Sequence, residues 1–325
     1  MDDSHKIKRI GILTSGGDAP GMNAVIRAVV RTACANGIEV KGIKRGYEGL
    51  LSGDIVDMNA RSVSEIIQKG GTILLTARSA DMMTKEGQEK AANICRFLGL
   101  DSLVVAGGDG SIKGALALSK LGVNIICIPA TIDLDLHCSD YTIGFDSAVN
   151  TAMEAITKIR DTSSSHERCS VVEVMGRDCG YLALWCAMTG GAEDVLLPEL
   201  SASEDEVIRR IIENRARGKR HNLVVVAEGM LRAVALAKKI QDMTGIETRP
   251  SILGYLQRGG APSALDRVHA SMMGYEAVNL IMERQFNKVV IFKDGAYSHM
   301  DIEEGLNVER RFNANMYHIA RMLAI

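Results

Sequence analysis

Short apolar runs rich in β-branched residues recur along the chain, and each is followed by a glycine-bearing turn or a segment with helical spacing. Five of these runs are KRIGILTSGGD (8–18), SLVVAGGDG (102–110), NIICIPATID (124–133), CSVVEVMGR (169–177) and NLVVVAEG (222–229). Continuous apolar strands that alternate with helices are typical of parallel sheets with both faces covered. The pattern therefore predicts an α/β fold assembled from βαβ units.

Two helices are predicted between these runs from apolar residues that recur at helical spacing. In residues 21–37 the apolar stripe consists of Met22, Val25, Ile26, Val29 and Val30. Gly37 is expected to end this helix. In residues 146–161 the stripe consists of Val149, Ala152, Met153, Ile156 and Ile159.

The length of 325 residues allows two domains of ordinary size or one large α/β unit. We favour two lobes joined by ordinary crossovers, because no stretch rich in Pro, Gly or Ser divides the chain. A ligand would then bind between the lobes.

The charge balance argues against a nucleic-acid or membrane partner. Lys and Arg total 38, Asp and Glu total 40, and the net charge is -2, so any anion site must be local. The chain lacks an apolar run of the roughly 20 residues needed to cross a bilayer, and its start, MDDSHKIKRI, does not resemble a signal peptide. We expect a cytosolic protein.

The seven cysteines are an odd number without a C-x-x-C pair. Most stand among apolar residues, so they are interpreted as reduced core thiols. His166 is three residues from Cys169 but lacks a second plausible ligand pair, so a zinc site is not expected.

The stretch PATIDLDLHCSD (129–140) places two carboxylates, Asp133 and Asp135, two residues apart. In an extended chain such residues point the same way, so both carboxylates would share a face. By itself this pair fits a solvated surface loop as well as a catalytic centre.

Two glycine turns follow predicted strands. TSGGDAPGMNA (14–24) contains Gly16, Gly17 and Gly21, and VVAGGDGS (104–111) adds Asp109 at the end of its strand. Glycines let backbone N–H groups approach a phosphate, and a carboxylate beside them suits a magnesium–nucleotide complex. The alternative is a pair of tight turns without a ligand.

Several arginines stand at the ends of predicted strands or turns. Arginine side chains bind phosphate oxygens in a bidentate fashion. Singly each could be a surface ion pair, but together they indicate a phosphorylated substrate. They are Arg78, Arg168, Arg177, Arg249 and Arg258, with Met175 and Glu228 nearby in the same kind of turn.

These motifs resemble those of the bacterial ATP-dependent 6-phosphofructokinases. The similarity runs almost from end to end, through IGILTSGGDAPGMNA, VVAGGDGS, YTIGFD, SVVEVMGR and LGYLQRGG. The resemblance implies an α/β fold of two Rossmann-like lobes, whose parallel-rich sheets are flanked by helices and whose active site lies in the cleft between them. The larger, nucleotide-binding lobe would comprise residues 1–144 and 257–307, and the smaller, sugar-phosphate-binding lobe residues 145–256 and 308–325.

The resemblance also implies an activity: transfer of the γ-phosphoryl group of ATP, with Mg²⁺, to the 1-hydroxyl of fructose 6-phosphate. Asp133 would be the catalytic base, and Asp135 would support the metal and the hydroxyl. Arg78, Arg177 and Thr131 would stabilise the transferring group. The nucleotide would contact Gly17, Arg78, Ser79, Gly108, Asp109, Gly110 and Ser111, and Asp109 would bring the Mg²⁺.

Sugar-phosphate binding is assigned in the same way to Met175, Gly176, Arg177, Glu228, Tyr255 and Arg258, together with Thr131, Asp133 and Asp135. Arg168 and Arg249 match arginines that reach into a neighbouring subunit's site, which implies a homotetramer with intersubunit active sites.

Four positions depart from the family pattern. Ala130 and Leu134 replace a glycine and an asparagine that flank the base, Tyr255 replaces a phosphate-contacting histidine, and Ser79 replaces an aromatic residue near the adenine. The alternatives left open are a kinase for tagatose 6-phosphate or sedoheptulose 7-phosphate, and a weakly active regulatory paralogue. Gly110 and Ala130 favour ATP, because diphosphate-using relatives carry an aspartate and a lysine there.

An effector pocket for ADP or phosphoenolpyruvate is implied by residues that match the family's allosteric site: Arg27, Arg31, Arg160, Glu193, Arg217 and Lys219. Ala60 stands where the family usually has arginine. If this segment is regular, the adjacent Arg61 points elsewhere. We therefore expect both effectors to bind weakly.

Overall fold

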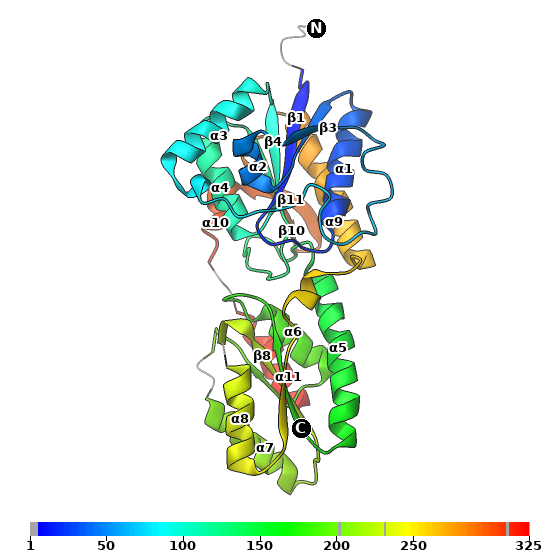
Figure 1. The fold of residues 1–325 in the computed structure, drawn as a ribbon, viewed down its shortest axis with the longest axis vertical. Coiled ribbons are helices and arrows are strands. Elements are labelled where there is room, and N and C mark those ends of the chain that lie inside the picture. The colour runs from blue at the N-terminus through cyan, green and yellow to red at the C-terminus, as the bar shows by residue number, and fades with distance from the viewer. Residues whose placement is uncertain (1–5, 201–202, 231, 310–311, 325) are drawn as a thin grey trace. The chain divides into compact units, whose positions relative to one another are not determined.

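The structure is a computed structural model that describes residues 6–200, 203–230, 232–309 and 312–324 (Figure 1). Residues 1–5 lie outside the described residues. They are part of the start of the chain that was compared with a signal peptide. The chain divides into two compact units. The larger unit comprises Met1–Asp146 and Arg258–Arg310, and the smaller unit comprises Ser147–Gln257 and Arg311–Ile325.

The larger unit contains a seven-stranded sheet in the order β11-β10-β5-β4-β1-β2-β3. Its five central strands are mutually parallel, and the edge pairs β2–β3 and β10–β11 are antiparallel. The strands are β1 Arg9–Ser15, β2 Glu39–Ile43, β3 Ile55–Met58, β4 Ser102–Gly107, β5 Ile125–Pro129, β10 Lys288–Lys293 and β11 Ala296–Asp301.

Helices cover both faces of this sheet, with α1 and α9 on one side and α3 and α4 on the other (Figure 1). Gly274 allows α9 to approach α1 closely, because a Cβ there would lie 2.6 Å from the Cβ of Ala28. The helical segments are α1 Met22–Ala35, α2 Gly46–Ser52, η2 Asp81–Met83, α3 Lys85–Phe97, α4 Asp109–Lys120, α9 Ala264–Met282 and α10 Ile302–Leu306.

The smaller unit contains a four-stranded parallel sheet in the order β7-β8-β6-β9. Its strands are β6 Cys169–Val174, β7 Asp194–Leu196, β8 Asn222–Ala227 and β9 Thr248–Ile252. Its helical segments are α5 Phe145–Ser165, which begins in the larger unit, α6 Tyr181–Gly190, α7 Glu204–Ala216, η3 Glu228–Met230, α8 Ala233–Thr244, η4 Gly254–Arg258 and α11 Ala314–Leu323. Val171, Val224 and Leu236 lie in its apolar core.

The predicted α/β class, with parallel-rich sheets flanked by helices, is confirmed. All five apolar runs contain a strand, and the predicted stripe of α1 is buried. The second predicted helix is four residues longer than expected at its C-terminal end and ends at Ser165. At this end Ser165 Oγ donates to the Asp161 carbonyl, and Ser163 Oγ donates to the Arg168 carbonyl just beyond the helix.

The seven cysteines are free, and all but Cys34 are buried. Burial raises the pKa of Cys169 and of Cys186 to about 12, so both remain protonated at neutral pH. The interpretation as core thiols is confirmed for six of the seven, because Cys34 is partly exposed. Within the described part of the chain, none of the helices has the length and apolar composition required to span a membrane.

A buried aromatic cluster surrounds His269 on α9. Its ring stacks on Tyr141, with centroids 3.9 Å apart, and its Nδ1 lies 3.1 Å from the Tyr297 hydroxyl. Burial lowers the pKa of His269 below its usual value, and the carboxylates of Asp266 and Asp146 oppose this shift. The folded chain therefore holds this histidine neutral.

This depressed pKa predicts acid sensitivity. As the pH falls below about 6.5, the unfolded chain binds a proton on His269 before the folded chain does. Stability should be lost as the pH falls from there toward the folded pKa. Thermal melts between pH 7.5 and 5 should show a smaller fall in Tm for His269→Gln than for wild type, while the exposed His299→Gln should leave the fall unchanged. Equal slopes for all three proteins would contradict this account.

Candidate functional site

Three predicted segments follow neighbouring strands of the larger unit. The first glycine turn begins after β1, the second after β4, and the Asp133 segment after β5. Since β5, β4 and β1 are adjacent and parallel, all three segments meet at the carboxyl edge of the sheet. Open α/β sheets bind their ligands at this edge.

Glycines allow the three segments to touch. A Cβ on Gly107 would lie 2.5 Å from the Ser15 carbonyl oxygen and 2.6 Å from Ser111 Oγ. A Cβ on Gly16 would lie 3.1 Å from the same hydroxyl, and a Cβ on Gly108 would lie 3.2 Å from Cβ of Thr131. Larger residues at these positions would force the segments apart.

Both glycine turns lead into helices whose first N–H groups lack a side-chain cap. The N-cap of α1 is Gly21, with φ 105°, and the N-cap of α4 is Gly108. Uncapped N–H groups and the helix dipole favour an anion. Beside the second turn, no atom lies within 4 Å of the position that a Cβ of Gly110 would occupy. The backbone there is open to a ligand.

Asp109 is the first residue of α4, and its carboxylate pairs with Lys113 Nζ at 2.7 Å. The described residues contain no cluster of three or more His, Cys, Asp or Glu side chains that could hold a metal ion. A single carboxylate beside uncapped N–H groups therefore fits Mg²⁺ that is bound mainly through nucleotide phosphates. It does not fit a metal held by the protein alone.

The loop that carries Arg78 and Ser79 is tied to the first glycine turn, because Thr76 Oγ1 donates to the Gly16 carbonyl at 2.7 Å. Arg78 is exposed. Ser79 Oγ is buried and makes no hydrogen bond with the described residues. This hydroxyl could bind a polar atom of a ligand.

The Asp133 segment is not extended, so the expectation that its two carboxylates share a face as in a strand is wrong in its premise. The chain bends at Asp133, and Leu134 has a φ of 52°. This left-handed conformation suits asparagine better than leucine. Asp133 is buried, with 8% exposure, and its backbone N–H donates to Thr131 Oγ1 at 3.2 Å.

Arg258 lies against the first glycine turn. Its Nη2 is 2.7 Å from Asp18 Oδ1, and its Nε donates to the Asp18 carbonyl at 3.3 Å. A Cβ on Gly17 would lie 2.8 Å from Nη2. The structure thus brings together Arg258, predicted for the sugar phosphate, and Gly17, predicted for the nucleotide.

In the smaller unit, too, predicted site residues follow the carboxyl ends of adjacent parallel strands. Met175, Gly176 and Arg177 follow β6, and Glu228 follows β8, the adjacent parallel strand. Glu228 Oε1 accepts a hydrogen bond from the Arg177 N–H at 2.7 Å.

Tyr255 follows β9, on the other side of β6, and is 78% exposed. Sequence reasoning missed Gln257, whose Oε1 accepts from the Met175 N–H at 2.9 Å.

Glu247 was also missed. Its carboxylate pairs with both Arg168, at 2.7 Å from Nε, and Arg249. The hydrogen bond to Arg168 and then that to Arg249 lower the pKa of Glu247. The only available signal was its position two residues before Arg249. Within one chain, the two arginines predicted to reach a neighbouring subunit share this carboxylate.

Three of the predicted effector residues form a cluster in the smaller unit. Glu193 is buried, and its Oε1 lies 2.8 Å from Lys219 Nζ and 3.8 Å from Arg160 Nη2. Arg217 is exposed at the C-cap of α7. Arg27 and Arg31 belong to α1 of the larger unit, as predicted.

Ala60 lies in a turn in which Asn59 Oδ1 accepts from the N–H groups of Arg61, at 2.8 Å, and Ser62, at 3.2 Å. The segment is not a regular element, so the argument that Arg61 points away from the position of Ala60 does not hold.

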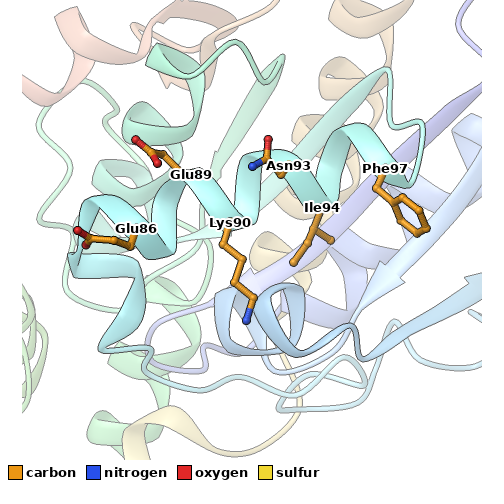
Figure 2. A pocket seen from close by; sticks show the side chains of 6 residues that line it. All are labelled: Glu86, Glu89, Lys90, Asn93, Ile94 and Phe97. Carbon is orange, nitrogen blue, oxygen red and sulfur yellow. The ribbon is translucent and has the colours of Figure 1, made fainter.

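A shallow groove of about 470 Å³ is lined by six residues of α3: Glu86, Glu89, Lys90, Asn93, Ile94 and Phe97 (Figure 2). These residues recur at spacings of three and four and so lie along the outer face of the helix, opposite the buried Ala91 and Cys95. None belongs to the predicted site, and the groove adds nothing to it.

Comparison with known proteins shows the family to which these motifs belong. The phosphofructokinase family model matches residues 9–281. The ATP-dependent 6-phosphofructokinase of Clostridium acetobutylicum is 56% identical over 98% of this chain and 100% of its own length. The enzyme of the same name from Clostridium botulinum strain Hall is 54% identical with the same coverage. The phosphofructokinase structure from Saccharomyces cerevisiae matches 98% of this chain with a TM-score of 0.86 and 33% identity, and the match spans 48% of that yeast chain.

Proposed function

The chain belongs to the phosphofructokinase family, and on that premise we propose how it phosphorylates fructose 6-phosphate with ATP. Its activity is that of an ATP-dependent 6-phosphofructokinase, a kinase of glycolysis. The products are fructose 1,6-bisphosphate and ADP. The observation that carries the proposal is the meeting of two uncapped glycine turns with the buried Asp133 segment at one sheet edge.

In this proposal the larger unit holds the nucleotide and the base. The N–H groups of the glycine turns bind ATP phosphates, and Asp133 takes the proton from the 1-hydroxyl of the sugar. Thr131 and Gly17 donate hydrogen bonds to the transferring group, and Asp135 supports the hydroxyl. Phosphoryl transfer depends chiefly on such positioning and on charge stabilisation. Mg²⁺ brought by Asp109 would neutralise phosphate charge when bound.

The arginines supply the remaining charge. Arg78 and Arg177 would stabilise the transferring phosphoryl group, because a guanidinium binds phosphate oxygens at two points. Glu228 fixes the backbone at Arg177, which supports this role. Arg168 and Arg249 would bind the sugar phosphate of a neighbouring subunit, and in that state they would exchange Glu247 for phosphate.

A homotetramer is part of the proposal, and α9 supports self-association. The helix buries one face in the larger unit, and its other face exposes an apolar stripe at spacings of three, four and seven residues. The stripe consists of Leu265, Val268, Met272, Tyr275 and Met282. Contiguous exposed apolar side chains commonly mark an interaction surface, so we infer that a second copy covers this stripe. The buried, protonated thiols agree with a cytosolic location.

One assay tests the proposal. The purified chain, given Mg-ATP and fructose 6-phosphate with coupled detection of ADP, should turn over without another protein. Turnover only after addition of a second phosphofructokinase chain would favour a regulatory paralogue. Tyr255 is exposed in place of the usual histidine, so kcat/KM should also be compared on tagatose 6-phosphate and sedoheptulose 7-phosphate. A higher value on either would reassign the sugar.

The side chain of Ala60 cannot donate a charged hydrogen bond to an anion, so the effector site should respond weakly unless Arg61 makes that contact in its place. One charged hydrogen bond is worth roughly 1.5–3 kcal/mol, or about one to two decades of affinity. Titration of ADP and phosphoenolpyruvate should show that Ala60→Arg lowers the concentration for half effect by about tenfold or more. The exposed Ala216→Arg, near Arg217, controls for added charge. A wild-type response at micromolar effector that Ala60→Arg leaves unchanged would contradict this prediction.

A further inference from the structure

A buried carboxylate outside the predicted site holds the backbone next to it. Asp266, in the first turn of α9, is 0% exposed. Its Oδ1 accepts hydrogen bonds from the Tyr141 hydroxyl and from the Gly144 N–H, both at 2.6 Å. One oxygen thus anchors both ends of the segment Tyr141–Gly144 to the helix.

The same segment is bonded to the chain that carries the proposed base. The Ile143 N–H donates to the Pro129 carbonyl at 3.0 Å, and Thr142 Oγ1 donates to the Thr131 carbonyl at 2.7 Å. Thr131 Oγ1 in turn accepts from the Asp133 N–H at 3.2 Å. Hydrogen bonds, joined by the covalent backbone of Tyr141–Gly144 and by Thr131, therefore connect Asp266 to the backbone of Asp133.

The segment also packs against the first glycine turn. A Cβ on Gly144 would lie 2.7 Å from the Cβ of Ala19 and 3.2 Å from Cγ2 of Ile132. A Cβ on Gly21 would lie 2.6 Å from Cγ2 of Ile143. The Tyr141–Gly144 segment therefore packs between the glycine turn proposed to bind phosphate and the Asp133 segment proposed to transfer the proton. A displacement of Tyr141–Gly144 would move both the turn and the Asp133 segment.

Tyr141 is suited to act as a permanent donor. Burial, and then the carboxylate of Asp266, raise the pKa of Tyr141 well above its usual value. The hydroxyl therefore keeps its proton over the working pH range, and its ring is fixed by stacking on His269.

We propose that Asp266 is a positioning residue for Asp133 and acts through Tyr141 and Gly144. This inference rests on the proposed function. Reacting groups must be held within a fraction of an ångström of productive geometry, and a displacement of about 1 Å can lower the rate by about 10²-fold. Asp266 supplies this constraint from a helix that contributes no catalytic side chain.

The sharpest test compares two identical substitutions in one aromatic cluster. Tyr141→Phe removes the bond to Asp266, whereas Tyr297→Phe removes only the bond to His269. Tyr141→Phe should lower kcat by about tenfold with little change in either KM, because positioning acts on the transition state. Tyr297→Phe should keep kcat while lowering Tm comparably. Equal effects of the two variants on kcat would overturn the proposal.

Substitution of the carboxylate itself gives a rescue test. Asp266→Ala should lower kcat by about 10²-fold. Asp266→Asn should recover at least a part of this loss, since its amide oxygen can still accept from the Gly144 N–H. An asparagine variant as slow as the alanine variant at equal folded fraction would argue against the mechanism. If Asp266→Ala does not fold, the pair of tyrosine variants decides.

A double variant separates this inference from the proposed function. If Tyr141 acts through Asp133, adding Tyr141→Phe to Asp133→Ser should cause no further loss of kcat. Multiplying losses would show that Tyr141 acts independently of the base, which overturns the inference alone. Normal turnover of Asp133→Ser by itself would instead contradict the role given to Asp133 in the proposed function.

Discussion

Replacing Asp133 by serine is expected to lower kcat by ~10²–10⁴-fold, the usual contribution of a general base. The affinity for fructose 6-phosphate should change little, because a base acts in the transition state and not in the bound ground state. Steady-state kinetics over a range of both substrates, together with direct measurement of sugar-phosphate binding, would separate the two effects.

The control for this prediction is Asp140→Ser, which removes an exposed carboxylate from the same loop. Asp140 Oδ2 accepts from the Asp294 N–H, so a small loss of stability is expected and kcat should remain near that of wild type. Near-normal turnover of Asp133→Ser, or an equal loss in the control, would show that Asp133 is not the base.

Much of the fold could be predicted because strands and helices reflect local periodicity. The stripe of Val25, Ile26 and Val29 is buried as expected, since helical spacing alone brings these residues to one face. The conformation of Leu134 could not be predicted in this way. Its positive φ depends on contacts made by the surrounding loop, and leucine has no intrinsic preference for it.

The glycine turns were predictable because parallel strands bring their carboxyl ends to one edge. The partners of the charged side chains could not be predicted, because these contacts depend on how segments far apart in the sequence pack together. Glu247 joins Arg168 across 79 residues of sequence, and Asp266 joins Tyr141 across 125. Periodicity cannot indicate contacts at such separations. Motifs in a single sequence indicate candidate site residues, but not the residues that would hold them in place.

The use of ATP as the phosphoryl donor is expected to depend on Gly110. This residue lies in the first turn of α4, and nothing lies within 4 Å of the position that its Cβ would occupy. An aspartate should therefore fit without a clash. Its negative charge, however, would lie at the helix terminus proposed to bind ATP phosphates and would oppose the dipole that attracts them.

Gly110→Asp should accordingly lower kcat/KM for ATP by ~10²–10³-fold, because like charges about 4 Å apart repel by about 4 kcal/mol at an effective dielectric constant of 20. Gly110→Asn is nearly isosteric and uncharged, and should lose less than about tenfold if charge and not bulk is decisive. Initial rates with ATP, and with diphosphate as the alternative donor, measure the effect. If the two variants lose equal activity, side-chain size rather than charge governs the donor site, and the exclusion of aspartate at this helix terminus cannot be the reason that the chain uses ATP.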